Sequence, residues 1–241
     1  MDNTVEVLLG GFPGKADIAF LGWSTVALIR FHHVNMLFDT GAHGARPMLI
    51  EKLSGFGLST NDITHVFLSH LHFDHCANIT LFPKATFFVS ETEWNYANSA
   101  HDIFVSETHL PFLDSYKKTF VLDNQELFPG IRCIYTPGHT PGGISLLVES
   151  RAGTIGLAGD AVKNRAELEL GSVAMSKDVE SSKQSINRLK DRADIIIPGH
   201  DCPLRICGNA VKPMQTCKVK IFLPDGLSGI NGQIYSLEIK N

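Results

Sequence analysis

The stretch Ser69-His70-Leu71-His72-Phe73-Asp74-His75 is the most informative part of this chain. It has the pattern H-x-H-x-D-H, which places three imidazoles and a carboxylate within six residues, His70 to His75. Imidazole binds zinc, copper, iron and nickel, and a carboxylate extends the choice to manganese. A single histidine is usually a surface or core residue, but this density of ligands directly after an apolar strand predicts a metal site.

Before the cluster, the apolar pattern alternates between strand spacing and helix spacing. Apolar and β-branched runs predict four strands and one helix. The strands are expected at residues 4–10, 24–31, 34–38 and 64–68, and the helix at residues 47–56. The last of these strands leads directly into the histidine cluster.

After the cluster, the chain continues with short strands and two further helices. The strands are expected at residues 85–89, 120–122, 131–135, 144–148, 154–158, 194–197, 217–223 and 232–239, and the helices at residues 90–98 and 178–192. Residues 97–116 have no regular pattern and are rich in aromatic side chains. They form either an ordinary packed excursion or a lid beside a pocket, since long irregular segments are often functional.

Five histidine or aspartate residues share one position relative to the predicted strands. Each of them closely follows the end of a strand: Asp39, His70, His139, Asp160 and His200. The C-terminal ends of strands gather ligand sites in open α/β sheets. The pattern therefore predicts one site assembled from segments that are far apart in the sequence.

The composition disfavours several classes of protein. Of the 241 residues, 44% are hydrophobic and 19% are charged, which is typical of a chain with a packed core. The net charge of −4 disfavours a general nucleic-acid-binding protein. The acidic N-terminal residues lack the basic start of a signal peptide, and the longest uncharged run, residues 18–29, is too short to cross a bilayer. We therefore expect a cytoplasmic protein with no membrane segment.

The five cysteines agree with this expectation. An odd number of cysteines without a secretion signal indicates reduced thiols. Cys202, Cys207 and Cys217 lie close together in the sequence, but they include no C-x-x-C pair. A zinc knuckle is therefore disfavoured at these cysteines.

Five segments, taken in order, resemble one family. They are Phe-Asp-Thr-Gly at 38–41, the cluster at 70–75, Gly-His-Thr-Pro-Gly at 138–142, Gly159-Asp160 and Gly199-His200. This series resembles the metallo-β-lactamase-fold hydrolase superfamily over about residues 35–201. The resemblance implies an α+β fold, a four-layer αβ/βα sandwich of two mixed sheets with helices outside. Because we find no internal repeat and no linker in the sequence, we expect one domain that spans residues 1–241.

The resemblance implies a role for each ligand as well. A first metal ion would be held by His70, His72 and His139. A second would be held by Asp74, His75 and His200. Asp160 would bridge the two ions, and Asp39 would orient the ligands through hydrogen bonds.

Two divalent ions at such a site predict hydrolytic chemistry. Imidazoles and carboxylates leave the pair of ions cationic enough to bind a bridging water, whose pKa falls toward about 7. The resulting hydroxide attacks an ester, lactone, thioester or phosphodiester, and Asp74 is the expected catalytic proton shuttle. We expect two zinc ions, with iron or manganese as alternatives.

The branches of this superfamily differ in substrate. The first expectation is a lactonase acting on a small molecule, an N-acyl-homoserine lactone, because residues 138–142, 185–190 and 199–201 resemble that branch. Such lactonases usually carry a tyrosine three residues after the bridging aspartate, where this chain has Lys163. Lys163 would be a catalytic hydrogen-bond donor in its place, or would bind a carboxylate or phosphate, or would be an ordinary exposed lysine.

Three alternatives stay open. The interpretation as a glyoxalase II-like thioesterase is weakened, because the residues after 207 have the pattern of strands instead of helices. A nuclease of the same fold, similar to small metallo-β-lactamase-domain proteins of animals and bacteria, would cleave RNA. It would use basic residues on one helix: Lys177, Lys183, Arg188, Lys190 and Arg192. A metal-stabilised ligand sensor is disfavoured, since every ligand position is filled.

The substrate pocket is expected beside the histidine cluster. Five side chains are predicted in its wall: Phe73, Trp94, Phe104, His109 and Phe112. They come from the cluster itself and from the aromatic region around residues 97–116. The sequence leaves the oligomeric state open, a homodimer included.

Overall fold

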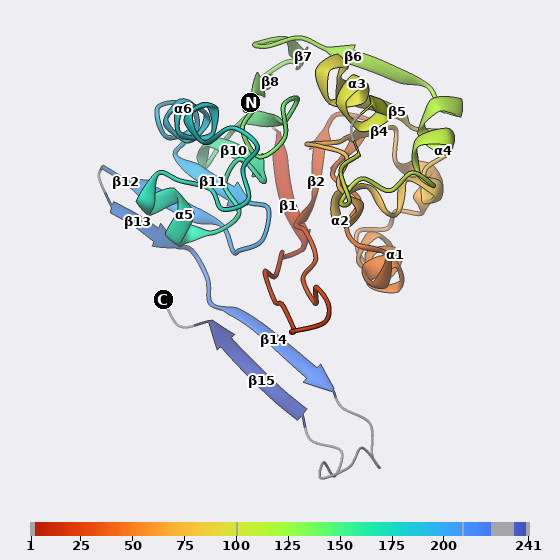
Figure 1. Ribbon diagram of the computed structural model, residues 1–241. Helices are drawn as coiled ribbons and strands as arrows, with labels where there is room; N and C mark the ends of the chain where they lie inside the picture. Colours follow the sequence, from red (N-terminus) through yellow and green to blue (C-terminus); the bar gives the residue numbers. More distant parts are fainter. Residues whose placement is uncertain (1–2, 100, 209, 223–233, 240–241) are drawn as a thin grey trace.

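Two mixed β-sheets pack face to face, and helices cover the outer face of each sheet (Figure 1). The computed structural model describes residues 3–99, 101–208, 210–222 and 234–239. Each sheet and its helices form half of the molecule, which gives the αβ/βα sandwich that the sequence predicted. The predicted fold class is therefore confirmed.

The first sheet has the strand order β1-β2-β3-β4-β5-β6. Its strands are β1 (Thr4–Leu9), β2 (Val26–Phe31), β3 (Val34–Phe38), β4 (His65–Phe67), β5 (Thr86–Ser90) and β6 (Lys118–Val121). The first three are antiparallel, and β3 to β6 run parallel to one another. Because β3 and β4 are parallel neighbours, Asp39 and His70 lie at the same edge of the sheet.

The second sheet has the order β13-β12-β11-β10-β9-β8-β7. Its strands are β7 (Glu126–Phe128), β8 (Ile131–Tyr135), β9 (Ile144–Ser150), β10 (Gly153–Gly159), β11 (Ile195–Pro198), β12 (Leu204–Cys207) and β13 (Ala210–Pro213). The pair β10–β11 is parallel and the other neighbouring pairs are antiparallel. Strands β8, β10 and β11 therefore end at one edge, where His139, Asp160 and His200 follow them.

Helices lie on the outer faces of both sheets. They are α1 (Arg46–Gly55), α2 (Phe73–Cys76), α3 (Glu91–Ser99), α4 (Leu110–Ser115), α5 (Arg165–Leu170) and α6 (Val179–Lys190), with single 3₁₀ turns at His43–Ala45, Thr60–Asp62 and Ile79–Leu81. Figure 1 shows α1 to α4 beside the first sheet and α5 and α6 beside the second. In the part of the chain that is described, no helix is both long and apolar enough to cross a membrane.

Alternating side chains of the strands form separate cores. On the first sheet, Met36 and Phe38 face the second sheet, whereas Leu37 faces the outer helices. Leu49 and Leu53 of α1 complete the outer core. The strand-end loops therefore rest on rigid layers, which is what a precisely built site requires.

The structure adds short elements to those that the sequence predicted. The additions are β7, β12, β13, α2, α4 and α5. Helix α5 had recognisable end signals, since Asn164 caps its start and Gly171 ends it with a φ of 67°. The tail forms the predicted hairpin of β14 (Cys217–Phe222) and β15 (Ile234–Ile239), and the predicted strand residues 223, 232 and 233 lie outside the described residues.

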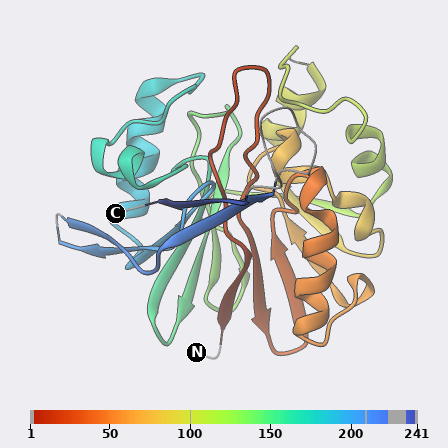
Figure 2. The same ribbon diagram turned by 90° about the horizontal axis from the view of Figure 1, so that it is seen from below.

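Residues 11–23, between β1 and β2, form a projecting loop. Two isolated bridges, Phe12 with Trp23 and Lys15 with Phe20, close it into an irregular hairpin. Figure 2 shows this loop extending past the ends of the strands, between the two helical layers. It lies at the edge of the sheets where the predicted ligands gather, since Trp23 O lies 3.0 Å from His200 Nδ1.

Candidate metal centre

Four of the predicted ligands lie in one short segment, between the end of β4 and α2. The chain leaves β4 extended and then turns into α2, because His75 N donates to His72 O at 3.0 Å. This turn places Asp74 and His75 beside His70, whose ring centre lies 4.0 Å from that of His75. The local backbone thus concentrates four ligand side chains at one point.

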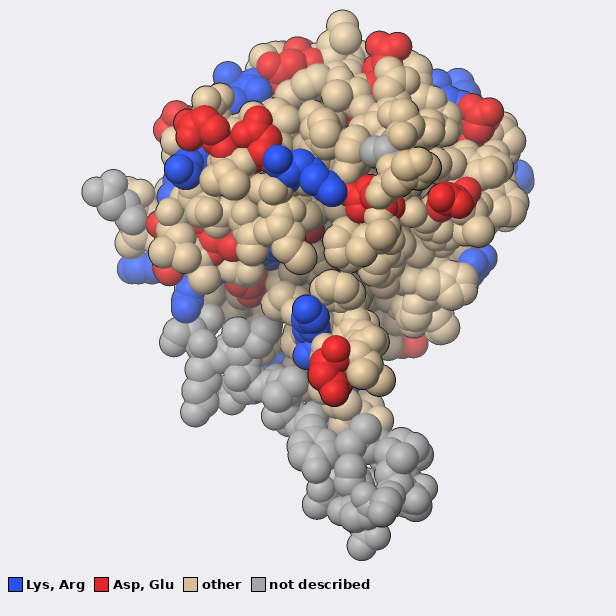
Figure 3. All heavy atoms as spheres, viewed as in Figure 1, with Lys and Arg blue, Asp and Glu red and all other residues tan. Residues whose placement is uncertain are grey.

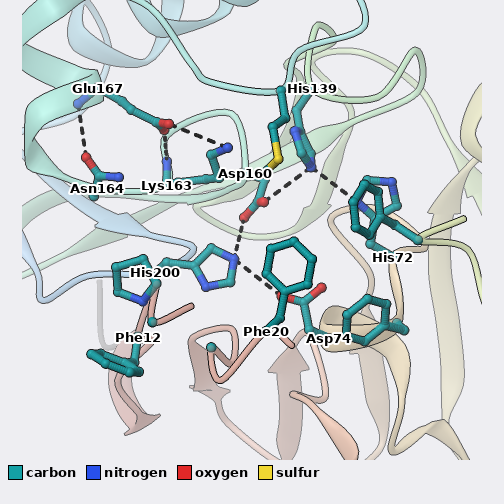
Figure 4. Close-up of a pocket in the computed structure, with 16 residues that line it drawn as sticks. Phe12, Phe20, His72, Asp74, His139, Asp160, Lys163, Asn164, Glu167 and His200 are labelled. Atoms are coloured by element: carbon teal, nitrogen blue, oxygen red, sulfur yellow. Dashed lines mark hydrogen bonds and ion pairs between the residues drawn. The ribbon is translucent and has the colours of Figure 1, made fainter. Parts of the chain in front are cut away.

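The other three predicted ligands come from three separate loops of the second sheet. Figure 4 shows the Asp160 carboxylate between His139 and His200. Asp160 Oδ2 lies 3.3 Å from His139 Nε2, and Asp160 Oδ1 lies 3.3 Å from His200 Nε2. Asp160 Oδ1 also lies 3.2 Å from His75 Nε2, so the two halves of the molecule meet at this carboxylate.

The ligand atoms form three overlapping groups in which all atoms lie within 4.8 Å of one another. The groups are His70–His72–His139, His70–His75–Asp160 and Asp74–His75–His200. The first and third groups contain the same residues as the two ligand sets expected from the sequence. The structure therefore brings together all seven residues that the sequence proposed as ligands.

Several ligand atoms are buried without a hydrogen-bond partner, which is evidence that these groups fit metal ions. Among the described residues, His70 Nε2, His75 Nε2 and Asp160 Oδ1 are buried and make no hydrogen bond. Such atoms cost free energy unless something satisfies them. Coordination would satisfy all three, and a set of imidazole and carboxylate donors suits zinc, iron or manganese.

Two of the imidazoles contact a carboxylate through the ring nitrogen that points away from the other ligands. His75 Nδ1 lies 2.7 Å from Asp39 Oδ2, and His72 Nε2 lies 3.4 Å from Asp102 Oδ2. A hydrogen bond at one ring nitrogen selects the tautomer and orients the ring. The opposite nitrogens therefore face the other ligand atoms: His75 Nε2 makes no hydrogen bond with any described residue, and His72 Nδ1 lies 3.1 Å from His139 Nε2.

Asp39 is fully buried and has a left-handed backbone conformation, with a φ of 58°. Its carboxylate accepts hydrogen bonds from Ser69 N at 2.7 Å and from Ser69 Oγ at 2.8 Å, and it also contacts His75. This conformation is unfavourable for a residue other than glycine, and the surrounding hydrogen bonds maintain it. Asp39 thus contacts a candidate ligand, His75, from outside the three ligand groups.

The buried carboxylates make this region attractive to positive charge. Burial alone would lower the pKa of His75, but Asp160, Asp74 and Asp39 outweigh burial and raise this pKa well above its ordinary value. Burial lowers the pKa of His139 to about 3, which keeps that imidazole neutral. A neutral imidazole can coordinate a cation, and a cation can take the place of the proton on His75.

Asp102 was not singled out in the sequence, although it contacts a candidate ligand. Its carboxylate accepts hydrogen bonds from Tyr96 OH and from Phe104 N, and it lies 3.2 Å from Lys177 Nζ. These partners fix the oxygen that faces His72. Asp102 lies in the irregular segment after α3, where no periodic pattern marks a buried carboxylate.

Glu93 is a second carboxylate that sequence reasoning missed. The sequence marks it only as a residue in the first turn of a helix, and Glu93 N does donate to the capping hydroxyl of Ser90 at 3.0 Å. Its buried side chain accepts hydrogen bonds from Leu71 N at 3.0 Å and from Gly142 N at 3.2 Å. Glu93 therefore joins the loop of His70 and His72 to the loop of His139.

A cavity of about 200 Å³ opens beside the ligands. Apolar side chains form much of its wall: Phe12, Phe20, Phe73, Phe104 and Met175. The ring centres of Phe20, from the 11–23 loop, and Phe104, from the segment after α3, lie 5.8 Å apart. An apolar cavity with a few polar groups at one end is typical of a site for a small molecule.

Two of the five residues predicted for the pocket wall line this cavity, namely Phe73 and Phe104. The structure places the other three elsewhere. Trp94 packs against the core outside the first sheet, His109 is half-buried at the start of α4, and Phe112 is 50% exposed. Trp94 and Tyr116 pack against the core outside the first sheet instead of lining the cavity. Phe12 and Phe20 of the 11–23 loop form part of the cavity wall.

Lys163 lines the cavity and is only 7% exposed, so it is not an ordinary exposed lysine. Its Nζ donates to Ala174 O and lies 3.5 Å from Glu167 Oε1 (Figure 4). Glu167 also accepts hydrogen bonds from Lys163 N and Ala174 N, both at 3.0 Å. The ammonium group is therefore held in a fixed frame at the polar end of the cavity.

Comparison with known proteins agrees with the fold and with the chemistry of the site. Residues 23–200 match the family model of the Metallo-beta-lactamase superfamily. The chain belongs to this superfamily, and it is a metal-dependent hydrolase.

Individual relatives are similar to this chain over much of its length. The chain is 32% identical over 221 residues to Metallo-beta-lactamase domain-containing protein 1 of Xenopus laevis, a match that covers 90% of this chain and 87% of the relative. It is 29% identical over 172 residues to an N-acyl homoserine lactonase of Bacillus thuringiensis, covering 71% and 65%. A solved N-acyl homoserine lactone hydrolase, with the product N-hexanoyl-L-homoserine bound at its catalytic metal center, matches with a TM-score of 0.64 and 25% identity, covering 76% and 83%.

Proposed function

We propose that this chain is a dinuclear, zinc-dependent hydrolase of a small ester-like substrate, with N-acyl-homoserine lactones as the first candidate. The observation that carries the proposal is the position of Asp160, whose two oxygens each lie 3.3 Å from a histidine of a different ligand group. A carboxylate in this position suits a bridge between two ions. The similarity to lactonases supports the substrate class.

In this proposal, the ligand groups divide between two ions. His70, His72 and His139 would hold one ion, Asp74, His75 and His200 would hold the other, and Asp160 would be shared between them. When bound, the two cations supply an acidic water and polarise the scissile carbonyl. Asp74 lines the cavity and its side chain is 17% exposed, so it is placed to accept a proton and return it to the leaving group.

The remaining cavity residues bind and position the substrate. The Lys163 ammonium group donates to the substrate carbonyl oxygen, or pairs with a carboxylate of the substrate. Phe20, Phe73 and Phe104 contact its apolar part and displace water from the reacting end. These roles make Asp74 and Lys163 the catalytic residues of the proposal.

The test combines elemental analysis with a panel of lactones, thioesters, phosphodiesters and RNA. We expect two zinc ions per chain and turnover of the lactones. His72→Ala and Asp160→Ala should lose metal and at least about 10³-fold in kcat/KM, whereas His32→Ala, at an exposed hairpin tip, should not. Full turnover after complete removal of metal would overturn the proposal.

The nuclease alternative is weakened by the positions of its basic residues. Lys177 lies before α6, which begins at Val179, so the five predicted basic residues do not share one helix. Arg188 Nη2 lies 2.9 Å from Asp123 Oδ2, and Figure 3 shows basic and acidic side chains interspersed on the face in view. Cleavage of RNA with a steep dependence on salt would favour the nuclease instead.

A further inference from the structure

A second cluster of ligand-type side chains lies just beyond His200. It consists of Asp201, Cys202 and Cys217, whose ligand atoms all lie within 4.8 Å of one another. Cys202 is 1% exposed, and Cys217 is half-buried. Cys217 is the first residue of β14, and Figure 1 shows β14 running away from the edge of the second sheet at β13.

The Asp201 carboxylate in this cluster is held in place by the backbone. Its Oδ2 accepts a hydrogen bond from Arg165 N at 2.9 Å, and its Oδ1 accepts one from Cys202 N at 2.7 Å. Cys217 Sγ approaches Oδ1 at 3.7 Å. An oxygen of fixed orientation therefore faces a sulfur supplied by a segment distant from it in the sequence.

The spacing of these atoms fits tetrahedral coordination. With zinc–sulfur bonds of about 2.3 Å and zinc–oxygen bonds of about 2.0–2.2 Å, a sulfur and an oxygen on one tetrahedral ion lie roughly 3.5 Å apart. The observed distance between Cys217 Sγ and Asp201 Oδ1 is 3.7 Å. Sulfur ligands select zinc and other thiophilic ions over magnesium or calcium.

We propose that Asp201, Cys202 and Cys217 form a separate binding site for a thiolate-preferring divalent cation of the zinc class, with water as the fourth ligand. The bound ion joins the start of the β14–β15 hairpin to the loop that carries His200. The absence of a C-x-x-C pair disfavoured a site at these cysteines in the sequence, but the fold brings Cys217 to Cys202 without that spacing. This inference is independent of the substrate and of the reaction.

Substitution with cobalt(II) provides a test that does not depend on activity. A thiolate bound to cobalt gives a charge-transfer band in the near ultraviolet, and the candidate metal centre cannot give this band because its ligands are nitrogen and oxygen only. We expect the band in the full chain, loaded with cobalt under anaerobic, reducing conditions. Cys217→Ser should abolish it and remove one equivalent of zinc from the zinc-loaded protein.

Cys207→Ser is the matched control. Cys207 is exposed at the end of β12 and lies outside the cluster, so this variant should keep both the band and the zinc content. Asp201→Asn is a second variant that leaves both thiols in place, and it should weaken cobalt binding measured by titration of the band. The proposal is overturned if the wild-type protein shows no band, if Cys217→Ser keeps it, or if Cys202 and Cys217 form a disulfide under these reducing conditions.

Discussion

The two halves of the molecule supply ligands to the candidate metal centre in different ways. The half built on the first sheet gives four ligands from one segment, His70 to His75. The half built on the second sheet gives three, each from its own strand-end loop: His139, Asp160 and His200. The first half therefore depends on one local turn, whereas the second depends on the register of several strands.

The halves also differ in how they orient their ligands. In the first half, buried carboxylates contact the imidazoles, as Asp39 contacts His75. The ligands of the second half are positioned by backbone groups and close packing, since His200 Nδ1 lies 3.0 Å from Trp23 O of the 11–23 loop and Gly199 packs against Asp160. The first half should therefore be sensitive to a change of charge and the second to an added atom.

Among the variants that keep every candidate ligand, the largest effect is expected from Gly199→Ala in the second half. A Cβ at this position would lie 2.2 Å from Asp160 Oδ1 and 2.9 Å from Gly159 O, so Asp160 must move. A displacement of about 1 Å at a reacting centre costs about 10²-fold or more in rate. We expect a loss of this size in kcat, together with a lower metal content measured by elemental analysis.

Gly44→Ala is the control for this variant, because a Cβ there meets no atom within 4 Å. It should keep wild-type activity and metal content. If Gly199→Ala retained both as well, close packing would not position Asp160, and the contrast between the two halves would fail.

The next largest effect is expected from Asp102→Asn, which tests whether the buried carboxylates of the first half contribute to metal affinity. Removing the charge behind His72 leaves the shape of the site intact but weakens the hold on the ring, which typically costs about 10- to 100-fold in metal affinity. The KM for a substrate should change little, because Asp102 is not among the described residues that line the cavity. Competition with a chelator measures the affinity.

A matched surface variant, Asp123→Asn, controls for the loss of one carboxylate. Asp123 pairs with Arg188 outside the site, so its variant should bind metal like the wild type. Equal affinities for Asp102→Asn and the wild type would show that Asp102 does not act through His72.

This contrast explains how much of the site could be predicted from the sequence. The first-half ligands are recognisable because they lie in one short pattern, and Asp39 because it precedes a glycine at a strand end. The second-half ligands were recognised by the same rule, since each follows a strand beside a glycine. The fold was implied by the resemblance of five ordered segments to one superfamily, and the arrangement of the two sheets confirms it.

The contacts that could not be predicted from the sequence join distant segments. Asp102 reaches His72 from the irregular segment after α3, and Cys217 reaches Asp201 from the start of the terminal hairpin. Neither contact leaves a periodicity or a fixed spacing in the sequence. The pocket wall was predicted only in part for the same reason. Phe73 and Phe104 line the cavity, but Phe20 comes from a loop whose position only the packed sheets determine.

The remaining effect, on stability instead of activity, concerns Glu93, which connects the two halves. Burial raises the pKa of Glu93 from about 4.5 to about 7, although hydrogen bonds from Leu71 N and Gly142 N act in the opposite direction. Because the folded protein binds this proton more tightly than the unfolded chain, the contribution of Glu93 to the free energy of unfolding is fully present below about pH 4.5. It is lost as the pH rises through about 7.

Glu93→Gln removes this titration, so the free energy of unfolding of the wild type should fall relative to that of the variant between about pH 4.5 and pH 7. Urea denaturation of both proteins, at the same metal concentration and at several pH values, measures the difference. Glu91→Gln changes an exposed residue two positions earlier, and its free energy of unfolding should vary with pH in the same way as that of the wild type. The contrary result is that the free energy of unfolding of Glu93→Gln varies with pH as that of the wild type does. The Glu93 carboxyl group would then be ionised in the folded protein, and the two halves would be connected by a charged group.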